Sequence, residues 1–208
     1  MSLVQPLPEA DAVDKTAQTY GRIKEMFGSD TVPEPFLIYG GVPAFLQDFY
    51  MNFKKFVWTA GKLDEKTKAI IGLAVSVTKG NDVWTTRMQE RLLSLGGTEQ
   101  EVADVLAVAA TCGMYNIFFK FRDIAGSDIF NGMSVGLRAH TFANTTLDDS
   151  TVELINIAIS DMNGCKPCTS GHVEKARQLG LNDEQILEAV QCAATMAAGA
   201  DFLNSAAL

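Results

Sequence analysis

The sequence predicts an all-α fold: a duplicated helical unit whose two pseudo-symmetric copies pack together, preceded by an N-terminal helical extension. Apolar residues recur with helical spacing, and no segment alternates between apolar and polar residues for long enough to form a convincing sheet. Residues 63–120 can also be laid on residues 147–204 without a gap, by a shift of 84 positions. The 208 residues are therefore expected to form a single domain, residues 1–208, made of four parts.

Composition and charge argue against several classes of function. The net charge is −8 and there is no run of Lys and Arg, so the basic surface of a nucleic-acid-binding protein is missing. The N-terminus has neither the basic region nor the apolar region of a signal peptide. No apolar run reaches the roughly 18–20 residues of a membrane span. We therefore expect a cytoplasmic protein, in which a close pair of cysteines favours catalysis or metal binding over a structural disulfide.

The first part of the chain, residues 1–62, is expected to be a helical extension. Helical periodicity runs over about residues 10–26, and a segment rich in Gly and Pro then breaks the chain at residues 28–35. A helix with aromatic residues on one side is expected over about residues 44–58. A short turn then leads into the repeated unit.

Each copy of the repeat is expected to contain two helices joined by a turn at glycine, followed by a third, longer helix. In the first copy, residues 63–120, Asp64 is suited to cap a helix that ends near residue 79. Thr98 and Asn182 each stand three residues before a Glu or Gln, which is the spacing of a capping box. These two boxes mark the start of the long helix in the first and the second copy.

A linker over residues 121–146 separates the copies, and the second copy occupies residues 147–208. The linker contains several Gly residues and is expected to be partly helical at most. A unit this short can hardly bury its own apolar faces, so the copies should pack on each other about a pseudo-twofold axis. Identical pairs across the copies include Leu63 and Leu147, Asp64 and Asp148, Thr67 and Thr151, Ser76 and Ser160, and Gly80 and Gly164.

Reactive side chains gather in one stretch of the second copy. They are a Cys-x-x-Cys pair, a histidine four residues after it and a glutamate twelve residues before it: Cys165, Cys168, His172 and Glu153. The matching positions of the first copy hold side chains that cannot do the same chemistry: Asn81, Trp84, Met88 and Ala69. The fold therefore does not require the reactive residues at these places, and their joint presence favours a catalytic role over packing.

The spacing places these groups where dithiol chemistry is favoured. Pro167 suits the first turn of a helix, which puts Cys165 near its N-cap and Cys168 in its first turn. The helix dipole and free backbone N–H groups there lower the pKa of a thiol. His172 lies on the same face as Cys168 and can exchange a proton with it. Glu153, on the preceding helix, could orient or charge-balance that histidine if the helices pack antiparallel. Such a set suits a disulfide–dithiol cycle.

Three other interpretations of the cysteines were weighed. A zinc site needs a second close pair of Cys or His, and the only other histidine, His140, is expected to be a linker or surface residue. A thioredoxin-like site needs a preceding strand, whereas this pair lies between expected helices. Any single member of the cluster could be an ordinary structural residue, but the four together argue against that. The remaining cysteines, Cys112 and Cys192, are expected to be small buried hydrophobic residues.

The pattern Glu-x11-Cys-x2-Cys-x3-His, in a duplicated all-helical unit, resembles the alkyl hydroperoxidase D (AhpD) and carboxymuconolactone decarboxylase superfamily. The resemblance covers the second copy well, the first copy as scaffold and the N-terminal part only loosely. It implies that Cys168 attacks a hydroperoxide, that Cys165 resolves the sulfenic acid as a disulfide, and that Glu153 and His172 relay the proton. It further implies a dithiol or protein disulfide reductant as partner and a homo-oligomer, either a trimer or a hexamer. No cofactor is expected, and no metal, because the chain lacks a second close pair of Cys or His.

The chain departs from the best-known members of that superfamily at one place. They carry a further relay histidine just before the second cysteine, where this chain has Pro167, so the implied relay is shorter. The decarboxylase branch lacks the cysteine pair, which argues against lactone decarboxylation here. The sequence predicts a thiol-dependent peroxidase or disulfide oxidoreductase. The alternatives are a decarboxylase-like lyase that uses the same helical pocket and a redox-sensing oligomer without turnover.

Overall fold

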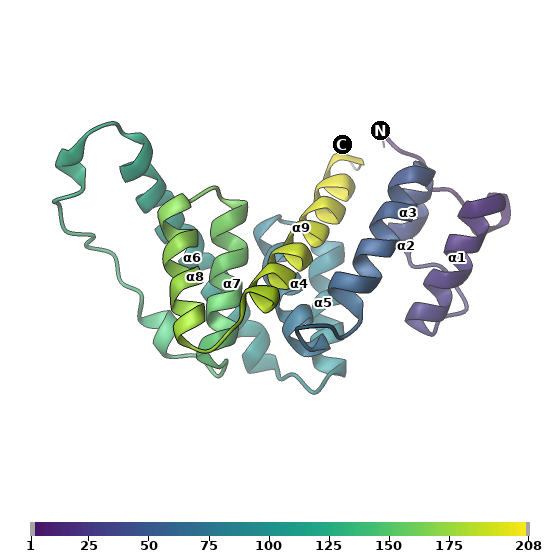
Figure 1. Cartoon of the computed structure of the whole chain (residues 1–208). Coiled ribbons are helices and arrows are strands. Elements are labelled where there is room, and N and C mark those ends of the chain that lie inside the picture. Colours follow the sequence, from purple (N-terminus) through teal and green to yellow (C-terminus); the bar gives the residue numbers. More distant parts are fainter. Residues whose placement is uncertain (1–2, 207–208) are drawn as a thin grey trace.

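The computed structural model describes residues 3–206, and over this range the chain is helical without a β-strand (Figure 1). The predicted all-α fold class is therefore confirmed. The α-helices are α1 (Asp14–Phe27), α2 (Glu34–Gly40), α3 (Pro43–Asn52), α4 (Glu65–Thr78), α5 (Asp82–Ser94), α6 (Glu99–Ile124), α7 (Asp149–Met162), α8 (Lys166–Gln178) and α9 (Asp183–Ala206). The shorter segments are η1 (Glu9–Asp11), η2 (Phe53–Trp58), η3 (Asp128–Phe130) and η4 (His140–Ala143).

The internal repeat is visible in the helix boundaries. Helices α4, α5 and α6 form the first copy and α7, α8 and α9 the second; each helix of the second copy begins 84 residues after its counterpart. The turns repeat as well, because Gly80 and Gly164 adopt the left-handed conformation with φ of 62° and 63°. A residue with a Cβ is disfavoured in this conformation, which explains why glycine ends the first helix of both copies.

The predicted helix caps are confirmed. The Asp64 side chain accepts a hydrogen bond from the backbone N–H of Thr67, at the start of α4. Thr98 and Glu101 form a complete capping box at the start of α6. At the start of α9 the side-chain Oδ1 of Asn182 accepts a hydrogen bond from the backbone N–H of Gln185. The side chain of Gln185 accepts one in return from the backbone N–H of Asn182. These capping side chains indicate where the helices start, because each accepts a hydrogen bond from a backbone N–H of the first turn that has no partner within the helix.

The two copies exchange equivalent contacts. Helix α4 packs against α9 of the other copy, and α7 packs correspondingly against α6. Glu188 on α9 accepts a hydrogen bond of 2.7 Å from the backbone N–H of Leu63, just before α4. Asp104, its counterpart on α6, accepts one of 2.6 Å from the N–H of Thr146, just before α7. Each copy thus holds the beginning of the other, as expected for packing about an approximate twofold axis.

The N-terminal extension covers the first copy with aromatic side chains. Tyr39 on α2 donates its hydroxyl to the carbonyl of Gly199 on α9 (2.8 Å) and accepts from the indole N–H of Trp84 on α5 (2.7 Å). Three further rings lie 5.1–5.9 Å from the Trp84 indole, those of Phe36, Phe49 and Phe53. In Figure 1 the extension lies at the side of the molecule away from α7 and α8.

The extension differs from expectation in its details. The first helix begins at Asp14 rather than near residue 10, after the short segment η1. The helix expected over residues 44–58 is α-helical only to Asn52 and continues as the π-helical segment η2. There the backbone N–H of Thr59 donates to the carbonyl of Lys54, five residues earlier. Period-based prediction does not distinguish these two windings, because both place aromatic residues on one side.

Helix α6 continues to Ile124 and thus runs past the start of the linker expected at residue 121. After it, the chain makes the projecting loop seen in Figure 1 and returns through η3 and η4 to α7. Side chains of α6 hold this loop: Tyr115 donates to the carbonyl of Leu137 (3.0 Å), and Thr111 bonds to Thr141 (3.2 Å). The loop therefore returns along α6 before entering the second copy.

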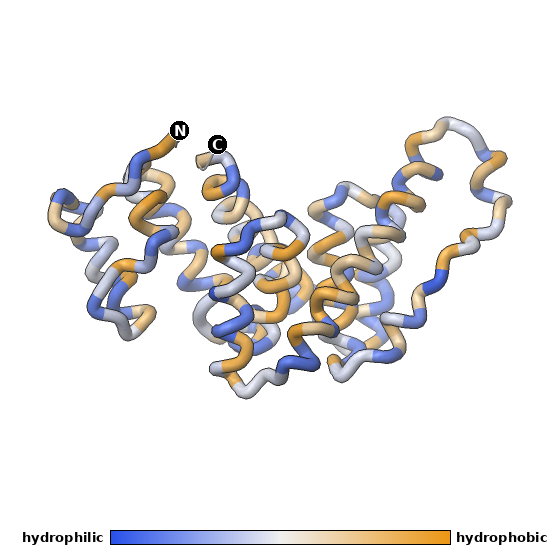
Figure 2. The backbone as a smooth tube through the Cα atoms, turned by 180° about the vertical axis from the view of Figure 1, so that it is seen from behind, coloured by the Kyte–Doolittle hydropathy of each residue, from blue (hydrophilic) through white to orange (hydrophobic). Residues whose placement is uncertain are grey.

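Within residues 3–206, two helices are long and apolar enough to cross a membrane by length and composition, namely α6 and α9. The expectation that no segment reaches this length does not hold once an occasional charged residue is allowed within the window. Both are helices through which the copies contact each other, α6 with α7 and α9 with α4. Figure 2 shows apolar and polar stretches alternating along the helices, which is the pattern of a helix with one packed side.

Candidate active site

The two close cysteines lie at the junction between α7 and α8. The backbone reverses at Gly164, and the N–H of Cys165 then donates to the carbonyl of Ser160 on α7 (3.0 Å). Cys165 is the N-cap residue of α8, Pro167 lies in its first turn, and Cys168 follows. The order expected from the sequence is therefore found, and it anchors the cysteine segment to the end of α7.

Cys165 and Cys168 are joined by a disulfide, with Cα atoms 5.3 Å apart. The two sulfur positions differ in access. Cys165 is fully buried (0% exposed), whereas Cys168 retains 8% of its surface and lines a pocket. A molecule that enters from solvent therefore reaches Cys168 first.

Glu153 and His172 form a hydrogen-bonded pair beside the disulfide. His172 Nδ1 on α8 lies 2.7 Å from Oε2 of Glu153 on α7. The second carboxylate oxygen, Oε1, accepts a hydrogen bond of 2.6 Å from Lys175 Nζ. Glu153 is buried (1% exposed), whereas His172 and Lys175 reach the surface. The carboxylate thus connects one imidazole and one ammonium group of α8 to the centre of the second copy.

The electrostatics of this group favour an ionised Glu153. Burial disfavours the charged form, but the hydrogen bonds from His172 and Lys175 outweigh it and hold the pKa of the carboxyl below its ordinary value. An ionised carboxylate can only accept, so His172 Nδ1 is the donor of this hydrogen bond. The opposite ring nitrogen, Nε2, is then the atom through which His172 can exchange a proton with the pocket.

The pocket beside Cys168 has a volume of about 360 Å³ and walls that are mostly apolar. It is bounded by α6, η4 and α8, through Tyr115, Phe119, Phe142, Pro167, Cys168, Gly171, His172 and Lys175. Its reactive groups lie together on the α8 side, and its aromatic groups come from α6 and the end of the linker. The arrangement suits a small molecule with an apolar body whose reacting end meets the disulfide or dithiol.

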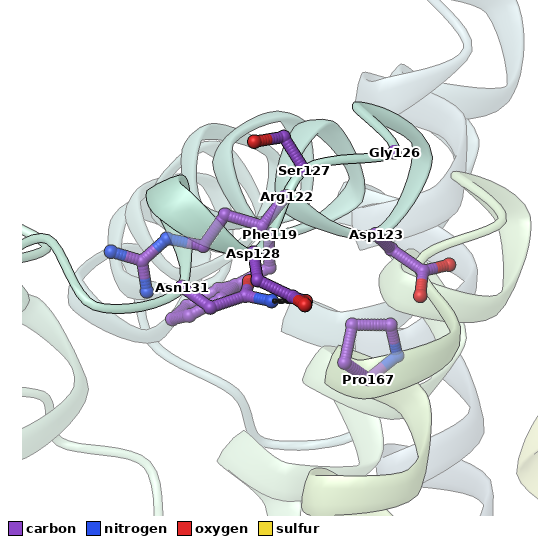
Figure 3. Close-up of a pocket in the computed structure, with 8 residues that line it drawn as sticks. All are labelled: Phe119, Arg122, Asp123, Gly126, Ser127, Asp128, Asn131 and Pro167. Carbon is purple, nitrogen blue, oxygen red and sulfur yellow. Dashed lines mark hydrogen bonds between the residues drawn. The ribbon is translucent and has the colours of Figure 1, made fainter.

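A second hollow, of about 420 Å³, adjoins the first and shares Phe119 and Pro167 with it. It lies between the end of α6 and η3, and Figure 3 shows its lining residues. In that view Asp123 extends toward Pro167, whereas the guanidinium of Arg122 lies on the opposite side. The approach to the cysteine segment from the linker side is therefore polar, in contrast to the aromatic pocket.

The fold and this site can be compared with known proteins. A sequence model of the carboxymuconolactone decarboxylase family matches residues 44–125 and again residues 131–208. The two matches together include more than half of the chain, one on each copy. The chain belongs to the carboxymuconolactone decarboxylase family.

Several proteins with similar sequences are named alkyl hydroperoxide reductase AhpD. The protein from Corynebacterium kroppenstedtii is 28% identical over 156 residues, 75% of this chain and 88% of its own. The one from Mycobacterium marinum is 26% identical over 165 residues, 79% of this chain and 91% of its own. The match to the protein from Solibacter usitatus, 34% identical over 98 residues, covers 47% of this chain and 55% of that protein.

A solved structure supports the fold of this family member. A protein from Burkholderia xenovorans, assigned as a gamma-carboxymuconolactone decarboxylase subunit, aligns with a TM-score of 0.64 at 16% identity. The alignment covers 93% of this chain and 98% of that one. At this identity the likeness concerns the fold alone. Family and relatives together indicate an enzyme with peroxidase-type or decarboxylase-type chemistry.

In this family member the structure brings together all four residues singled out in the sequence. Glu153 and His172 are hydrogen-bonded, Cys165 and Cys168 are bonded to each other, and Cys168 and His172 line one pocket. The other histidine of the chain, His140, is exposed at the start of η4, in the linker, as expected.

Sequence reasoning missed Lys175 and the aromatic walls of the pocket. Lys175 lies three residues after His172, on the same face of α8, and its counterpart in the first copy, Arg91, is also a cation. That match was the available signal. The contribution of Phe142 had no such signal, because it depends on the path by which the linker returns to α7.

Cys112 and Cys192 are both buried, as expected, but their surroundings differ. Burial raises the pKa of the Cys192 thiol to about 12. Cys112 lies among polar groups of α6 and α7: its Sγ is 3.4 Å from Ser160 Oγ and 3.6 Å from both Asn116 Oδ1 and the carbonyl of Asn156. The expectation of a purely hydrophobic role therefore fits Cys192 better than Cys112.

Proposed function

We propose that this protein is a thiol-dependent peroxidase that reduces organic hydroperoxides through a cycle between the Cys165–Cys168 dithiol and its disulfide. The observation that carries the proposal is the disulfide itself, placed at an apolar pocket beside a hydrogen-bonded carboxylate–imidazole pair. Similarity to proteins named alkyl hydroperoxide reductase supports the same chemistry.

The cycle balances with an external dithiol as reductant. The Cys168 thiolate attacks the terminal oxygen of ROOH, the O–O bond breaks, and Cys168 sulfenic acid and an alkoxide form. The alkoxide takes up the proton that Cys168 gave to the relay and leaves as ROH. The Cys165 thiol then attacks the sulfenic sulfur, which forms the disulfide and releases water. An external dithiol, free or part of a protein, restores both thiols and is itself oxidised to a disulfide.

The assignment of roles follows from access and from the relay. Cys168 lines the pocket and is the sulfur that a hydroperoxide can reach, whereas buried Cys165 is suited to resolve it from within. His172 can take the thiol proton at Nε2 and return it to the alkoxide, because its Nδ1 is held by Glu153. Glu153 stabilises the imidazolium formed in between. With Pro167 before the second cysteine, His172 is the imidazole available for this step.

The environment of the reaction forms part of the proposal. We place the protein in the cytoplasm, where dithiol reductants keep such a pair reduced. It requires no metal or other cofactor for this cycle, and it acts as a homo-oligomer, a trimer or a hexamer. A hydroperoxide and a dithiol or a protein disulfide reductant are its partners.

The test is a titration of free thiols, with intact-mass measurement, before and after one equivalent of cumene hydroperoxide. The fully reduced protein should lose two thiols and two mass units, with the new bond mapped to Cys165 and Cys168. Addition of a dithiol should restore both thiols and allow further peroxide to be consumed. If both thiols stay free at neutral pH, the peroxidase proposal is wrong.

A carboxymuconolactone-decarboxylase-like lyase is the second candidate, favoured by the family match. Such a lyase would use the pocket without the thiols. Alkylation of Cys165 and Cys168 should then leave its activity unchanged, whereas the peroxidase loses all activity. A redox-sensing oligomer would instead change its assembly mass on oxidation and would consume no peroxide beyond one equivalent.

A further inference from the structure

Asn156 is a buried residue of the second copy with no assigned role. It lies on α7, one helical turn after Glu153, and is 0% exposed. Neither its side-chain nitrogen nor its side-chain oxygen has a hydrogen-bond partner among the groups of residues 3–206. An unpaired amide in a protein interior carries a large desolvation cost, so it calls for a physical explanation.

The first copy shows what surrounds this position. The counterpart of Asn156 is Gly72, and a Cβ added there would lie 2.9 Å from the sulfur of Met88 and 3.6 Å from Cγ of Met196. Met88 is the counterpart of His172, and Met196 that of Cys112. Around Gly72, therefore, two methionine side chains, one on α5 and one on α9, occupy the place where the second copy has an amide. By this equivalence Asn156 lies between His172 and Cys112.

The second copy is also polar around this amide. Cys112 Sγ is 3.6 Å from the Asn156 carbonyl, and Asn116 donates to Ser160 Oγ (2.9 Å). Burial raises the pKa of the Cys112 thiol, and the nearby charge of Glu153 acts in the same direction, so this thiol stays protonated. In the equivalent space around Gly72, only the counterpart of Ser160, which is Ser76, keeps a polar side chain; Cys112, Asn116 and Asn156 correspond there to Met196, Ala200 and Gly72. The polar interior therefore accompanies the reactive residues.

We propose that Asn156 is a positioning residue of the Glu153–His172 relay, whose amide binds a buried water molecule that hydrogen-bonds to this pair. A buried water typically makes about three hydrogen bonds, and an amide that offers two donors and an acceptor supplies part of this set. The water supports the histidine in the orientation that receives the proton of Cys168. The proposal rests on the dithiol cycle for its purpose, but it can be tested on the thiol alone.

The test compares Asn156→Leu with the wild type after reduction by a phosphine. Leucine has the same number of side-chain heavy atoms as asparagine and no polar group. The readout is the rate at which iodoacetamide alkylates Cys168 between pH 5 and 9, mapped by peptide mass. We expect Asn156→Leu to shift the midpoint of this profile upward by about one pH unit. Below the midpoint, this shift corresponds to a roughly tenfold lower rate of alkylation. Asn156→Ser, which retains a hydroxyl and leaves room for water, should recover most of this rate.

A thermal unfolding measurement separates this role from a structural one. If the amide served packing only, its replacement would alter the unfolding midpoint and leave the alkylation profile unchanged, which would overturn the proposal. We expect the reverse: a shifted alkylation profile with an unfolding midpoint close to that of the wild type, because leucine fills the volume of the amide and needs no hydrogen-bond partner. Thr195→Val, an isosteric loss of a buried hydroxyl on α9, is the matched control and should leave the alkylation profile unchanged.

Failure of the proposed function would look different. A wild-type protein whose Cys168 is alkylated with the expected pH dependence but which forms no disulfide with cumene hydroperoxide would refute the peroxidase, not the role of Asn156. Identical alkylation profiles for wild type and Asn156→Leu would refute the role of Asn156 and leave the peroxidase standing.

Discussion

In the second copy, the pocket between α6 and α8 opens onto Cys168 and His172, whereas the matching space of the first copy, between α9 and α5, is filled with side chains. Trp84 and Met88 stand where the second copy has Cys168 and His172, and both are buried. The N-terminal extension then closes this space, through the hydrogen bond between Trp84 and Tyr39.

A small residue of α9 makes this closure possible. Gly199 corresponds to Tyr115 of the open pocket, and a Cβ there would lie 2.5 Å from the ring of Phe49. The two copies thus use one backbone in opposite ways. The first copy has packing side chains at these positions and is covered by the N-terminal extension, whereas the second copy has reactive groups that line an open pocket. The repeated unit therefore does not need the reactive residues in order to form its three helices.

The largest effect should come from the reacting sulfur. Cys168→Ser should abolish disulfide formation with hydroperoxide, because a hydroxyl at this place is far less nucleophilic than a thiolate. Cys165→Ser should still react once and leave a sulfenic acid on Cys168 or a mixed disulfide, visible by mass after trapping with dimedone. Cys192→Ala serves as the control and should behave as wild type. Equal, partial losses in both serine variants would contradict the assigned roles.

Replacement of the equivalent residue in the first copy should affect stability instead. Trp84→Ala should lower the free energy of unfolding by about 3–5 kcal/mol, because a fully buried indole and its hydrogen bond to Tyr39 are lost. The rate of disulfide formation in the folded fraction should stay within about twofold of wild type. Urea unfolding and thiol titration on the same sample measure both. A loss of less than about 1 kcal/mol, well under the about 3–5 kcal/mol usual for such a change, would refute the interpretation that Trp84 fills the space that is open in the second copy.

Much of this contrast could be predicted from sequence, since the repeat, the caps and the positions of Cys165 and Cys168 depend on local signals. Helix starts at Asp64 and Thr98 follow from side chains that pair with neighbouring backbone groups. The closure of the first-copy space by the N-terminal extension could not be predicted, because the hydrogen bond from Tyr39 to Gly199 joins residues far apart in the chain. The π-helical winding of η2, after α3, also depends on tertiary packing, because this segment contacts α4 and α9.

For the site, sequence predicted the residue types and their faces but not the complete network. That His172 and Cys168 share one helix face follows from spacing alone. That Glu153 reaches His172, and that Lys175 shares the carboxylate, depends on how α7 and α8 pack. The unpaired amide of Asn156 is invisible in the sequence, since an asparagine in an apolar helix gives no sign of what its side chain faces.

Loss of the relay carboxylate should be the next largest effect. Glu153→Gln should slow disulfide formation by roughly 10²-fold at neutral pH, the range typical of positioned acid–base groups. The amide cannot stabilise the imidazolium and so should raise the pH at which Cys168 becomes reactive. Stopped-flow rates against pH are the measurement. Glu174→Gln, an exposed change on α8, the helix that carries His172, is the control, and an unchanged pH profile for Glu153→Gln would remove Glu153 from the mechanism.

The same carboxylate should make stability depend on pH. Because the pKa of Glu153 is lower in the folded protein than the ordinary value of about 4.3, its contribution is fully present above that value and is lost as the pH falls through the folded pKa. Between pH 6 and pH 3 the wild type should therefore lose more free energy of unfolding than Glu153→Gln. Urea unfolding at both pH values measures this, and parallel losses would show that folding does not lower the pKa of Glu153.

The smallest effect is expected at Lys175, which holds the other carboxylate oxygen from a position 56% exposed to solvent. Lys175→Met should slow disulfide formation less than tenfold, and the difference should shrink at high salt, where exposed charges are screened. Lys175→Arg places in the second copy the residue of the first, Arg91, which forms an ion pair of 2.6 Å with Glu65. Because a guanidinium retains the charge, this variant should keep most of the wild-type rate. Equal losses of rate for the methionine and arginine variants would mean that Lys175 acts through its shape and not through its charge. Lys175 and Arg91 would then not have equivalent roles in the two copies.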